Sequence, residues 1–215
     1  MDENVRKIMD IKLERTKKAL EKNNMNAIIL NNVDEVVSYF KNTVEADSRL
    51  SVGGSQTLFE AGLIDLFREM PIYFEDRYEE GITREQQHEI FRKAFTCDYY
   101  VTSSNAVSES GELYNIDGTG NRVAAMAYGP KKVIVVVGEN KLVVSLPDAM
   151  KRLETTAAPM NAQRLERKTP CTITGTCSEC YSEERICSTY TVTKRQTTPN
   201  KGRITVLLVK ENLGY

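Results

Sequence analysis

The sequence predicts an α/β domain built on a mostly parallel sheet that helices cover on both faces. Segments with apolar residues at helical spacing alternate along the chain with short apolar runs that are typical of strands. Residues 133–137 (VIVVV) are apolar without interruption, as strands buried on both faces of a parallel sheet are. Together these observations favour parallel strands joined by crossover helices.

The first half of the chain supplies most of the predicted helices. Apolar residues recur at helical spacing from Val5 to Leu20, which predicts a helix over residues 3–24. Thr83 and Gln86 form a capping-box pattern at the start of a later helix. Further predicted helices span 34–42, 55–70 (ended by Pro71) and 83–95, and predicted strands span 27–30, 50–52 and 72–74.

The second half supplies three predicted strands and one helix, over residues 98–102, 133–137, 204–209 and 146–157. Residues 161–202 hold four of the five cysteines and no strong periodicity, which predicts irregular structure. A length of 215 residues suits a domain of residues 1–160 with a Cys-rich appendage and closing strand, 161–215, packed on it.

Composition excludes several classes of protein. Apolar residues make up 40% and charged residues 27%, as in globular rather than disordered chains. With a net charge of -1 and no long basic run, we expect no nucleic-acid partner. The longest apolar strand run, residues 133–137, is too short to span a membrane, and residues 1–10 lack the apolar core of a signal peptide. We therefore expect a cytoplasmic protein in a reducing environment.

Glycine-rich turns are the first candidate site. Five of the twelve glycines fall between positions 111 and 138, in a stretch that is rich in Ser and Asn and poor in charge. Glycine allows close backbone approach to a ligand. Ligands of open α/β sheets bind beyond the carboxyl ends of the strands, where these turns are expected. The turns therefore predict a site for an anionic small molecule.

The segment GGSQT follows one predicted strand and opens a helix, so its free N–H groups suit an anion. The alternative is a glycine turn closed by a serine N-cap. From this segment we take as candidate ligand-binding residues Gly53, Gly54, Ser55 and Thr57.

The run from Asn105 to Gly111 contains a single acid, Glu109, in neutral surroundings. Glu109 is the candidate catalytic residue, as a nucleophile or a base. The alternative is a solvent-facing loop carboxylate.

The segment DGTGNR is a turn whose Arg122 can clamp a carboxylate or phosphate, or else pair with Asp117 or Glu112. Lys141 follows the strongest strand at the same predicted edge; the alternative is a solvated lysine. The further candidate ligand-binding residues are Asn105, Asp117, Gly118, Gly120, Asn121, Arg122 and Lys141.

Four cysteines form the second candidate site: Cys171, Cys177, Cys180 and Cys187, spaced C-x5-C-x2-C-x6-C. Four thiolates suit tetrahedral zinc or an iron–sulfur cluster, and a metal would order a segment with little apolar content. The alternatives are two disulfides or four free thiols. Cys97 stands apart as a buried small residue, and His88 is expected on a helix surface.

Three segments together resemble the lactate-utilization (LUD) domain family: GGSQTL, TSSNAVSESGELYNIDGTGNRVAAM and GPKKVIVVVGENKLV. The resemblance covers roughly residues 5–215. It implies a fold like that of the sugar-phosphate isomerase and CoA-transferase superfamily. Family members accompany iron–sulfur proteins in bacterial oxidation of L-lactate to pyruvate, which implies iron–sulfur partner proteins and favours a cluster over zinc at the cysteines.

The tetrapeptide Ser108–Gly111 is similar to the Ser-Glu-Asn-Gly signature of CoA transferases, in which the glutamate attacks a thioester; Ser110 replaces the asparagine here. The resemblance thus predicts a component of an iron–sulfur-dependent L-lactate oxidation and electron-transfer system. The alternative is a CoA-transferase-like or sugar-phosphate-isomerase-like enzyme that binds an anionic small molecule.

Overall fold

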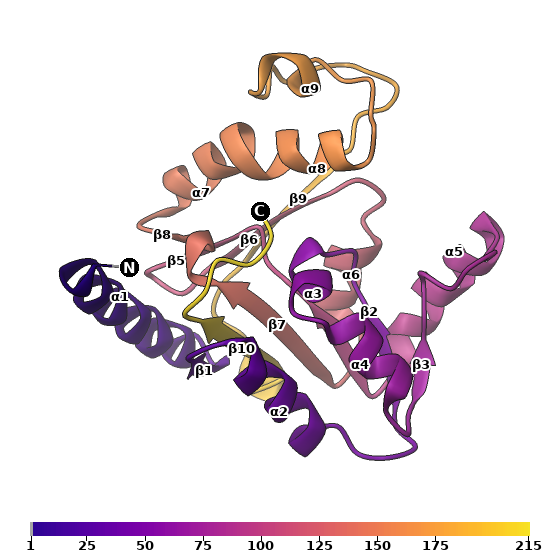
Figure 1. Cartoon of the computed structure of the whole chain (residues 1–215), viewed down its shortest axis with the longest axis horizontal. Coiled ribbons are helices and arrows are strands. Elements are labelled where there is room, and N and C mark those ends of the chain that lie inside the picture. Colours follow the sequence, from indigo (N-terminus) through magenta and orange to yellow (C-terminus); the bar gives the residue numbers. More distant parts are fainter. Residues whose placement is uncertain (1) are drawn as a thin grey trace.

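A six-stranded parallel sheet forms the centre of the protein, as a computed structural model that describes residues 2–215 shows (Figure 1). Every neighbouring pair of its strands is parallel. The predicted α/β class with a mostly parallel sheet is confirmed. In spatial order the strands are β1 (Asn26–Leu30), β10 (Ile204–Val209), β7 (Lys132–Gly138), β4 (Tyr99–Thr102), β2 (Arg49–Val52) and β3 (Tyr73–Glu75).

Helices cover both faces of this sheet, and β7 shows how. Ile134 and Val136 pack in one core cluster, while Val133, Val135 and Val137 pack in another on the opposite face. Successive strand residues point to opposite faces, so both sets must be apolar. The first face is covered by α2 (Val33–Thr43), α3 (Gln56–Glu60) and α4 (Leu63–Glu69), and the second by α1 (Glu3–Lys22) and α6 (Asn121–Tyr128).

A single helix was expected over residues 55–70, and the structure corrects this to two. α3 ends at Glu60, and α4 begins at Leu63. Between them Gly62 adopts a left-handed φ of 63°, which glycine tolerates and which interrupts the helix. The capping box of Thr83 and Gln86 is present at the start of α5 (Arg84–Lys93), which is followed by a 3-10 turn, η1 (Ala94–Thr96).

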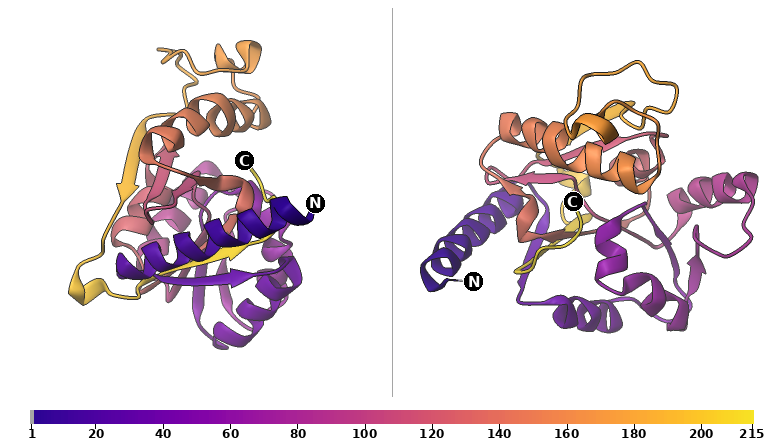
Figure 2. Two further views of the ribbon diagram at one scale, coloured as in Figure 1. Left: turned by 90° about the vertical axis from the view of Figure 1, so that its left-hand side faces the viewer. Right: turned by 45° about the horizontal axis from the view of Figure 1, so that its top comes forward.

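A second, four-stranded sheet was not expected from the sequence. Its order is β8 (Leu142–Val143), β5 (Ala106–Ser108), β6 (Leu113–Asp117) and β9 (Thr189–Thr193). β5 and β8 are parallel, and the other two pairs are antiparallel. The expected helix over 146–157 extends further, as α7 (Leu146–Arg152), a π-helical turn, η3 (Leu153–Ala157), and α8 (Ala158–Arg164). This helical run packs on the small sheet on the side away from the main sheet (Figure 2).

The end of the chain is more integrated than an appendage. Residues 165–188 contain one short helix, α9 (Cys171–Thr174), and are otherwise irregular. β9 then completes the small sheet, and a 3-10 turn, η4 (Thr198–Asn200), leads to β10. Because β10 lies between β1 and β7, residues 204–209 form an interior strand of the main sheet.

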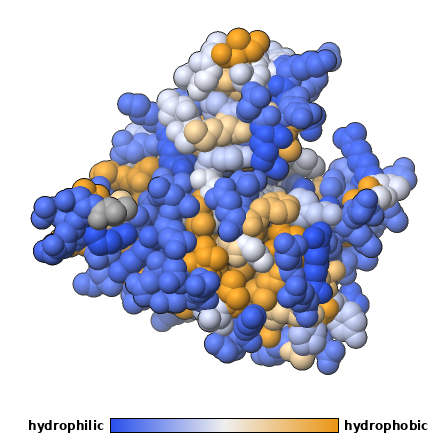
Figure 3. Space-filling model, viewed as in Figure 1, coloured by the Kyte–Doolittle hydropathy of each residue, from blue (hydrophilic) through white to orange (hydrophobic). Residues whose placement is uncertain are grey.

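The surface is mostly hydrophilic (Figure 3), but α1 exposes the apolar side chains of Val5, Ile8 and Ile11. Hydrophobic residues gather near the middle of the face shown, over β7 and β10. No helix within residues 2–215 is long and apolar enough to cross a membrane.

Candidate functional site

The direction in which successive strands are added to the main sheet changes between β2 and β4. β3 lies outside β2, and the chain then returns to the other side of β2 to form β4. The connection after β2 enters α3 on one face, whereas the connections after β4 and β6 lead to α6 on the other. Connections that diverge in this way leave a crevice at the carboxyl ends of the strands, where open α/β sheets bind ligands.

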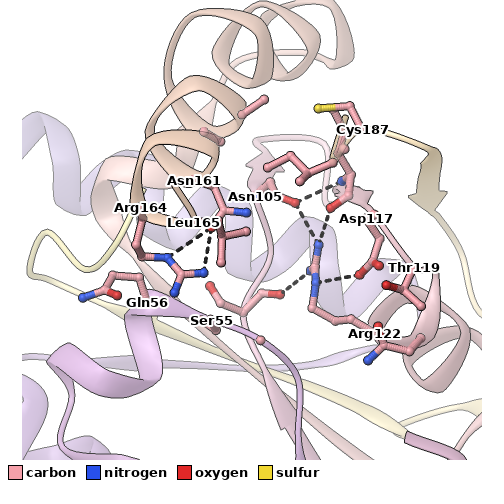
Figure 4. A pocket seen from close by; sticks show the side chains of 18 of the residues that line it. Ser55, Gln56, Asn105, Asp117, Thr119, Arg122, Asn161, Arg164, Leu165 and Cys187 are labelled. Carbon is pink, nitrogen blue, oxygen red and sulfur yellow. Dashed lines mark hydrogen bonds and ion pairs between the residues drawn. The ribbon is translucent and has the colours of Figure 1, made fainter. Parts of the chain in front are cut away.

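A pocket of about 670 Å³ occupies this crevice. Its walls come from several parts of the chain. They include the β2–α3 turn, the segment from β3 into α5, the ends of β4 and β6, the start of α6, the turn after β7, and η3 and α8 with the residues after them. Figure 4 shows Asn161 and Arg164 of α8 facing Ser55 and Gln56, with Asp117 and Arg122 to one side. The small sheet and its helices thus close a site that the main sheet opens.

The β2–α3 turn needs the first of its two glycines, whereas a Cβ would fit at the second. A Cβ on Gly53 would lie 2.5 Å from Thr102 Oγ1 and 2.9 Å from the hydroxyl of Tyr100, so packing alone excludes a side chain. A Cβ on Gly54 would lie 3.4 Å from a terminal nitrogen of Arg77. Ser55 occupies the N-cap position of α3, but its side chain makes no cap hydrogen bond.

Arg122 is buried and organises the pocket wall. Its Nη1 donates to the carbonyl of Ser103 and to Asn115 Oδ1, at 3.1 and 2.6 Å. Its Nη2 donates to Asn105 Oδ1 and to the carbonyl of Ile116, at 3.0 and 2.6 Å. The remaining nitrogen, Nε, lies 3.3 Å from Asp117 Oδ2. The guanidinium therefore ties the end of β4 to β6 and pairs with Asp117, one of the two alternatives expected for it.

The turn that presents Arg122 is built around Asp117 and Gly120. Asp117 Oδ1 accepts a hydrogen bond of 2.6 Å from the Gly120 N–H. Gly120 has a φ of 85° and precedes α6, so a residue with a side chain would be strained there. Gly118 lies against the backbone of Ile186, where a Cβ would be 3.3 Å from the carbonyl oxygen.

Lys141 supplies a buried amine. It lies in η2 (Glu139–Lys141), the turn after β7, and is 3% exposed. Its Nζ donates to Thr57 Oγ1 at 2.6 Å and to Ser103 Oγ at 3.1 Å. Burial, together with the positive charges of Arg152 and Arg122, lowers the pKa of Lys141 to about 7. An amine with such a pKa can transfer a proton or attack a carbonyl at neutral pH.

Four more arginines border the pocket: Arg77, Arg84, Arg164 and Arg167. Within residues 2–215, neither these arginines nor Lys141 form an ion pair. Asp117 is the single acid of the described lining, and Arg122 already engages it. The pocket therefore carries a strong excess of positive charge.

Arg77 stacks against an aromatic ring at the border of the pocket. Its guanidinium carbon lies 4.4 Å from the centre of the Phe91 ring, in a cation–π contact. Its Nε is buried and has no hydrogen-bond partner within residues 2–215. A buried donor without a partner is energetically costly.

The structure brings together most of the residues that the sequence indicated. Eight predicted ligand-binding residues line the pocket: Gly54, Ser55, Asn105, Asp117, Gly118, Asn121, Arg122 and Lys141. Gly53, Thr57 and Gly120 lie behind the lining, where they support Arg122 and Lys141. Their role as direct ligand contacts stays a prediction.

Glu109 lies elsewhere. It follows β5, its side chain pairs with Arg15 of α1, and its N–H donates to the carbonyl of Val143 at 2.8 Å. Glu109 is not among the residues that line the pocket. Its catalytic role stays a prediction, and any chemistry inside the pocket falls to other side chains.

Sequence reasoning missed the four pocket arginines and placed His88 on an open helix surface, whereas it lines the pocket beside Phe91. Single basic residues on separate elements leave no motif.

The four clustered cysteines border a second, small cavity, and all are free thiols. Cys187 also lines the large pocket. Burial, followed by the negative charge of Cys177, raises the pKa of the Cys187 thiol to about 11. Cys97 is buried between η1 and β4, as expected for a small core residue.

Fold and site together define a class: an α/β protein with a pocket bordered by several arginines at the switch point of a parallel sheet. Within that class, the chain belongs to the LUD domain family, whose family model matches residues 13–209. It is thus a lactate-utilization-domain protein. No protein of curated function matches the sequence.

Among solved structures, the chain is similar to a DUF162 family protein from Deinococcus radiodurans, with a TM-score of 0.53 and 12% identity over 94% of this chain and 97% of that one. This likeness concerns the fold alone. It is also similar to eIF2B delta from Chaetomium thermophilum (TM-score 0.36, 16% identity, 55% of this chain and 50% of that one). A malonate decarboxylase alpha subunit from Acinetobacter baumannii gives a TM-score of 0.41 and 11% identity, over 97% of this chain and 38% of that one. At these last two scores the likeness says nothing about function.

Proposed function

We propose that the pocket at the β2–β4 switch point binds an organic anion that carries several negative charges, such as a sugar phosphate or a CoA ester. One observation carries the proposal: Arg77, Arg84, Lys141, Arg164 and Arg167 border one cavity and have no acidic partner within residues 2–215. Arginine forks match carboxylate and phosphate geometry, and several of them suit a ligand with several anionic groups.

The size of the pocket supports a ligand larger than a three-carbon hydroxy acid. Sites for drug-sized ligands and cofactors span roughly 300–1,000 Å³, and this pocket has about 670 Å³. L-lactate alone would leave most of that volume filled with water. A phosphorylated or CoA-linked molecule fills more of it and satisfies more of the cations.

Lys141 is the group to which we assign chemistry in this pocket. Its amine is fixed by Thr57 and Ser103, and its pKa near 7 leaves a large neutral fraction at neutral pH. The side chain is therefore suited to proton transfer at a carbon or oxygen of the bound ligand. In this proposal Arg77, Arg84 and Arg164 bind the anionic groups, and Asn105 and Arg122 shape the wall.

A second candidate function is a component of an iron–sulfur-dependent oxidation of L-lactate or a related hydroxy acid, with iron–sulfur partner proteins. Family membership supports it, and so does the position of Cys187 on the wall of the pocket. Protein prepared without oxygen would then contain iron and sulfide and pass electrons from a hydroxy acid to an acceptor protein. Colourless, iron-free protein that accepts no reconstituted cluster would contradict this candidate.

A ligand panel tests the main proposal. Thermal unfolding is followed at low ionic strength with coenzyme A, acetyl-coenzyme A, a pentose phosphate, inorganic phosphate and L-lactate. We expect the organic phosphates to raise the Tm more than L-lactate does, and to lose this effect as salt screens the charges. No Tm shift with any phosphate, or the largest shift with L-lactate, would contradict the proposal.

A further inference from the structure

The segment of residues 165–188 is ordered with almost no core of its own. Its buried residues are Thr169 and Cys187 alone. Two of its large apolar side chains point outward, with Ile173 89% and Tyr181 100% exposed. Burial of apolar surface is what normally offsets the entropy of ordering a chain. Something other than hydrophobic packing must therefore hold this segment in place.

The four cysteines of the segment converge on one point. Cys171, Cys177, Cys180 and Cys187 all line a single cavity of about 20 Å³, which lies beside α8. A volume of roughly 10–15 Å³ holds one water molecule, so the cavity suits a single atom or ion. None of the four forms a disulfide.

The turn between Cys177 and Cys180 brings both cysteines to the same cavity. Glu179 takes a left-handed φ of 50°, which turns the chain sharply and places both cysteines at one cavity. The Glu179 N–H lies 3.4 Å from Cys177 Sγ and donates to it. Such a donor stabilises negative charge on a thiolate.

Arg185 closes the other side of the cavity. Its Nη1 donates to the carbonyl of Cys180 at 2.6 Å, and its Nε donates to the carbonyl of Cys187 at 2.8 Å. The guanidinium thereby joins the two halves of the segment and brings positive charge to the thiols. A site with several thiolates needs such a charge nearby.

We propose that Cys171, Cys177, Cys180 and Cys187 bind one Zn²⁺ ion, which orders residues 165–188. On binding, the four thiols release four protons to solvent, and each sulfur donates an electron pair to the metal. As they stand, no three Cys, His, Asp or Glu side chains of residues 2–215 have metal-binding geometry, so the thiols must rotate toward the cavity. The cavity is of single-ion size, which favours zinc over an iron–sulfur cluster. This proposal does not depend on a ligand in the large pocket.

Metal content tests the proposal directly. Protein prepared without oxygen or chelator is analysed for zinc, iron and acid-labile sulfide, beside two variants of the cluster, Cys177→Ser and Cys180→Ser. Cys97→Ser is the matched control, because Cys97 is buried but does not line the cavity. We expect one zinc per chain in the wild type and in Cys97→Ser, and at least a tenfold loss in both cluster variants.

Cobalt gives a second measurement that needs no variant. When Co²⁺ replaces the metal in the wild type, we expect the absorption bands of tetrahedral cobalt with thiolate charge transfer. Iron with an equal amount of sulfide would overturn the single-ion site in favour of a cluster. Disulfides in protein kept from oxygen, or four reactive thiols with no zinc and no cobalt bands, would overturn metal binding altogether.

Discussion

The Nζ of Lys141 lies 2.6 Å from the Oγ1 of Thr57, and no carboxylate pairs with this amine in residues 2–215. Two hydroxyls hold it, since Ser103 Oγ also accepts a hydrogen bond from it at 3.1 Å. The fold thus keeps a buried amine fixed by two hydroxyls at the edge of a cationic pocket, where the nearby charge of Glu60 only partly offsets those of Arg152 and Arg122. This arrangement makes the charge of Lys141 sensitive to pH and to any anion beside it.

The first prediction concerns pH and stability. The pKa of Lys141 falls from its ordinary value of 10.5 to about 7 on folding. Between these values the unfolded chain binds more protons than the folded one, so the free energy of unfolding should rise as pH rises. Urea unfolding at about pH 7 and about pH 9 should show a gain of up to about 2 kcal/mol from this group.

Lys141→Met removes this pH dependence, because no amine is left to titrate. Lys131→Met, at an exposed position, is the control and should keep the wild-type dependence. An identical pH dependence in the wild type and Lys141→Met would show that the amine is not perturbed in the folded chain.

The second prediction concerns proton uptake on ligand binding. An anion next to Lys141 favours the charged amine and should raise its pKa, so the complex takes up a proton fraction at about pH 8. Calorimetric titrations with the best organic phosphate, in two buffers of different ionisation enthalpy, measure this uptake. The uptake should vanish in Lys141→Met and persist in Lys131→Met; uptake that survives in Lys141→Met places the titrating group elsewhere.

The third prediction separates a structural arginine from the ligand-binding ones. Arg122 is 8% exposed and satisfies Asp117, Asn105 and two backbone carbonyls. Arg122→Met should lower the free energy of unfolding by about 3–5 kcal/mol, because it leaves a buried carboxylate without its partner. Arg122→Lys should rescue little, since an ammonium cannot reproduce the planar set of contacts. A loss below about 1 kcal/mol in chemical denaturation would contradict this role.

The fourth prediction concerns Glu109. Its side chain pairs with Arg15 and lies outside the pocket lining. Glu109→Gln should therefore leave the Kd for an organic phosphate within about twofold of wild type, with a stability loss near the roughly 1 kcal/mol of a partly exposed ion pair. If Glu109→Gln abolishes a measured CoA-transfer activity while Arg15→Gln does not, the nucleophilic role implied by the CoA-transferase signature is restored.

The main sheet was predictable because its strands carry strong local signals. The apolar runs at 133–137 and 204–209 must be buried on both faces of a sheet. In the structure these two strands pair with each other, and helices cover both of their faces. The small sheet could not be predicted from the sequence. Its strands β5, β6 and β9 are short, and they carry polar residues whose burial depends on partners far along the chain. The break between α3 and α4 was missed for a local reason. The apolar pattern continues through both helices, but Gly62 has a φ of 63°, which ends the first helix.

The parts of the candidate site that lie in turns could be predicted from the sequence. The isolated charged residues that complete it could not. Asp117, Gly120 and Arg122 are close in sequence, and their turn geometry follows from residue type. Arg77 and Arg164 come from the β3–α5 connection and from α8, and only the folding of the small sheet onto the main one brings them to the same cavity. No spacing rule in the sequence relates them.

The central claim is that the cationic pocket binds an organic anion with several charges, and one calorimetric comparison tests it most directly. The tightest organic phosphate of the panel is titrated into the wild type, Arg84→Gln and Arg92→Gln. Both arginines lie on α5, but Arg84 lines the pocket, whereas Arg92 pairs with Glu89 outside it. Arg84→Gln removes one charged hydrogen bond to the ligand, which contributes about 1.5–3 kcal/mol to binding. We therefore expect its Kd to be at least about tenfold higher than that of the wild type, and the Kd of Arg92→Gln to be unchanged. Equal affinities for all three proteins, or no binding of any phosphate to the wild type, would contradict the claim.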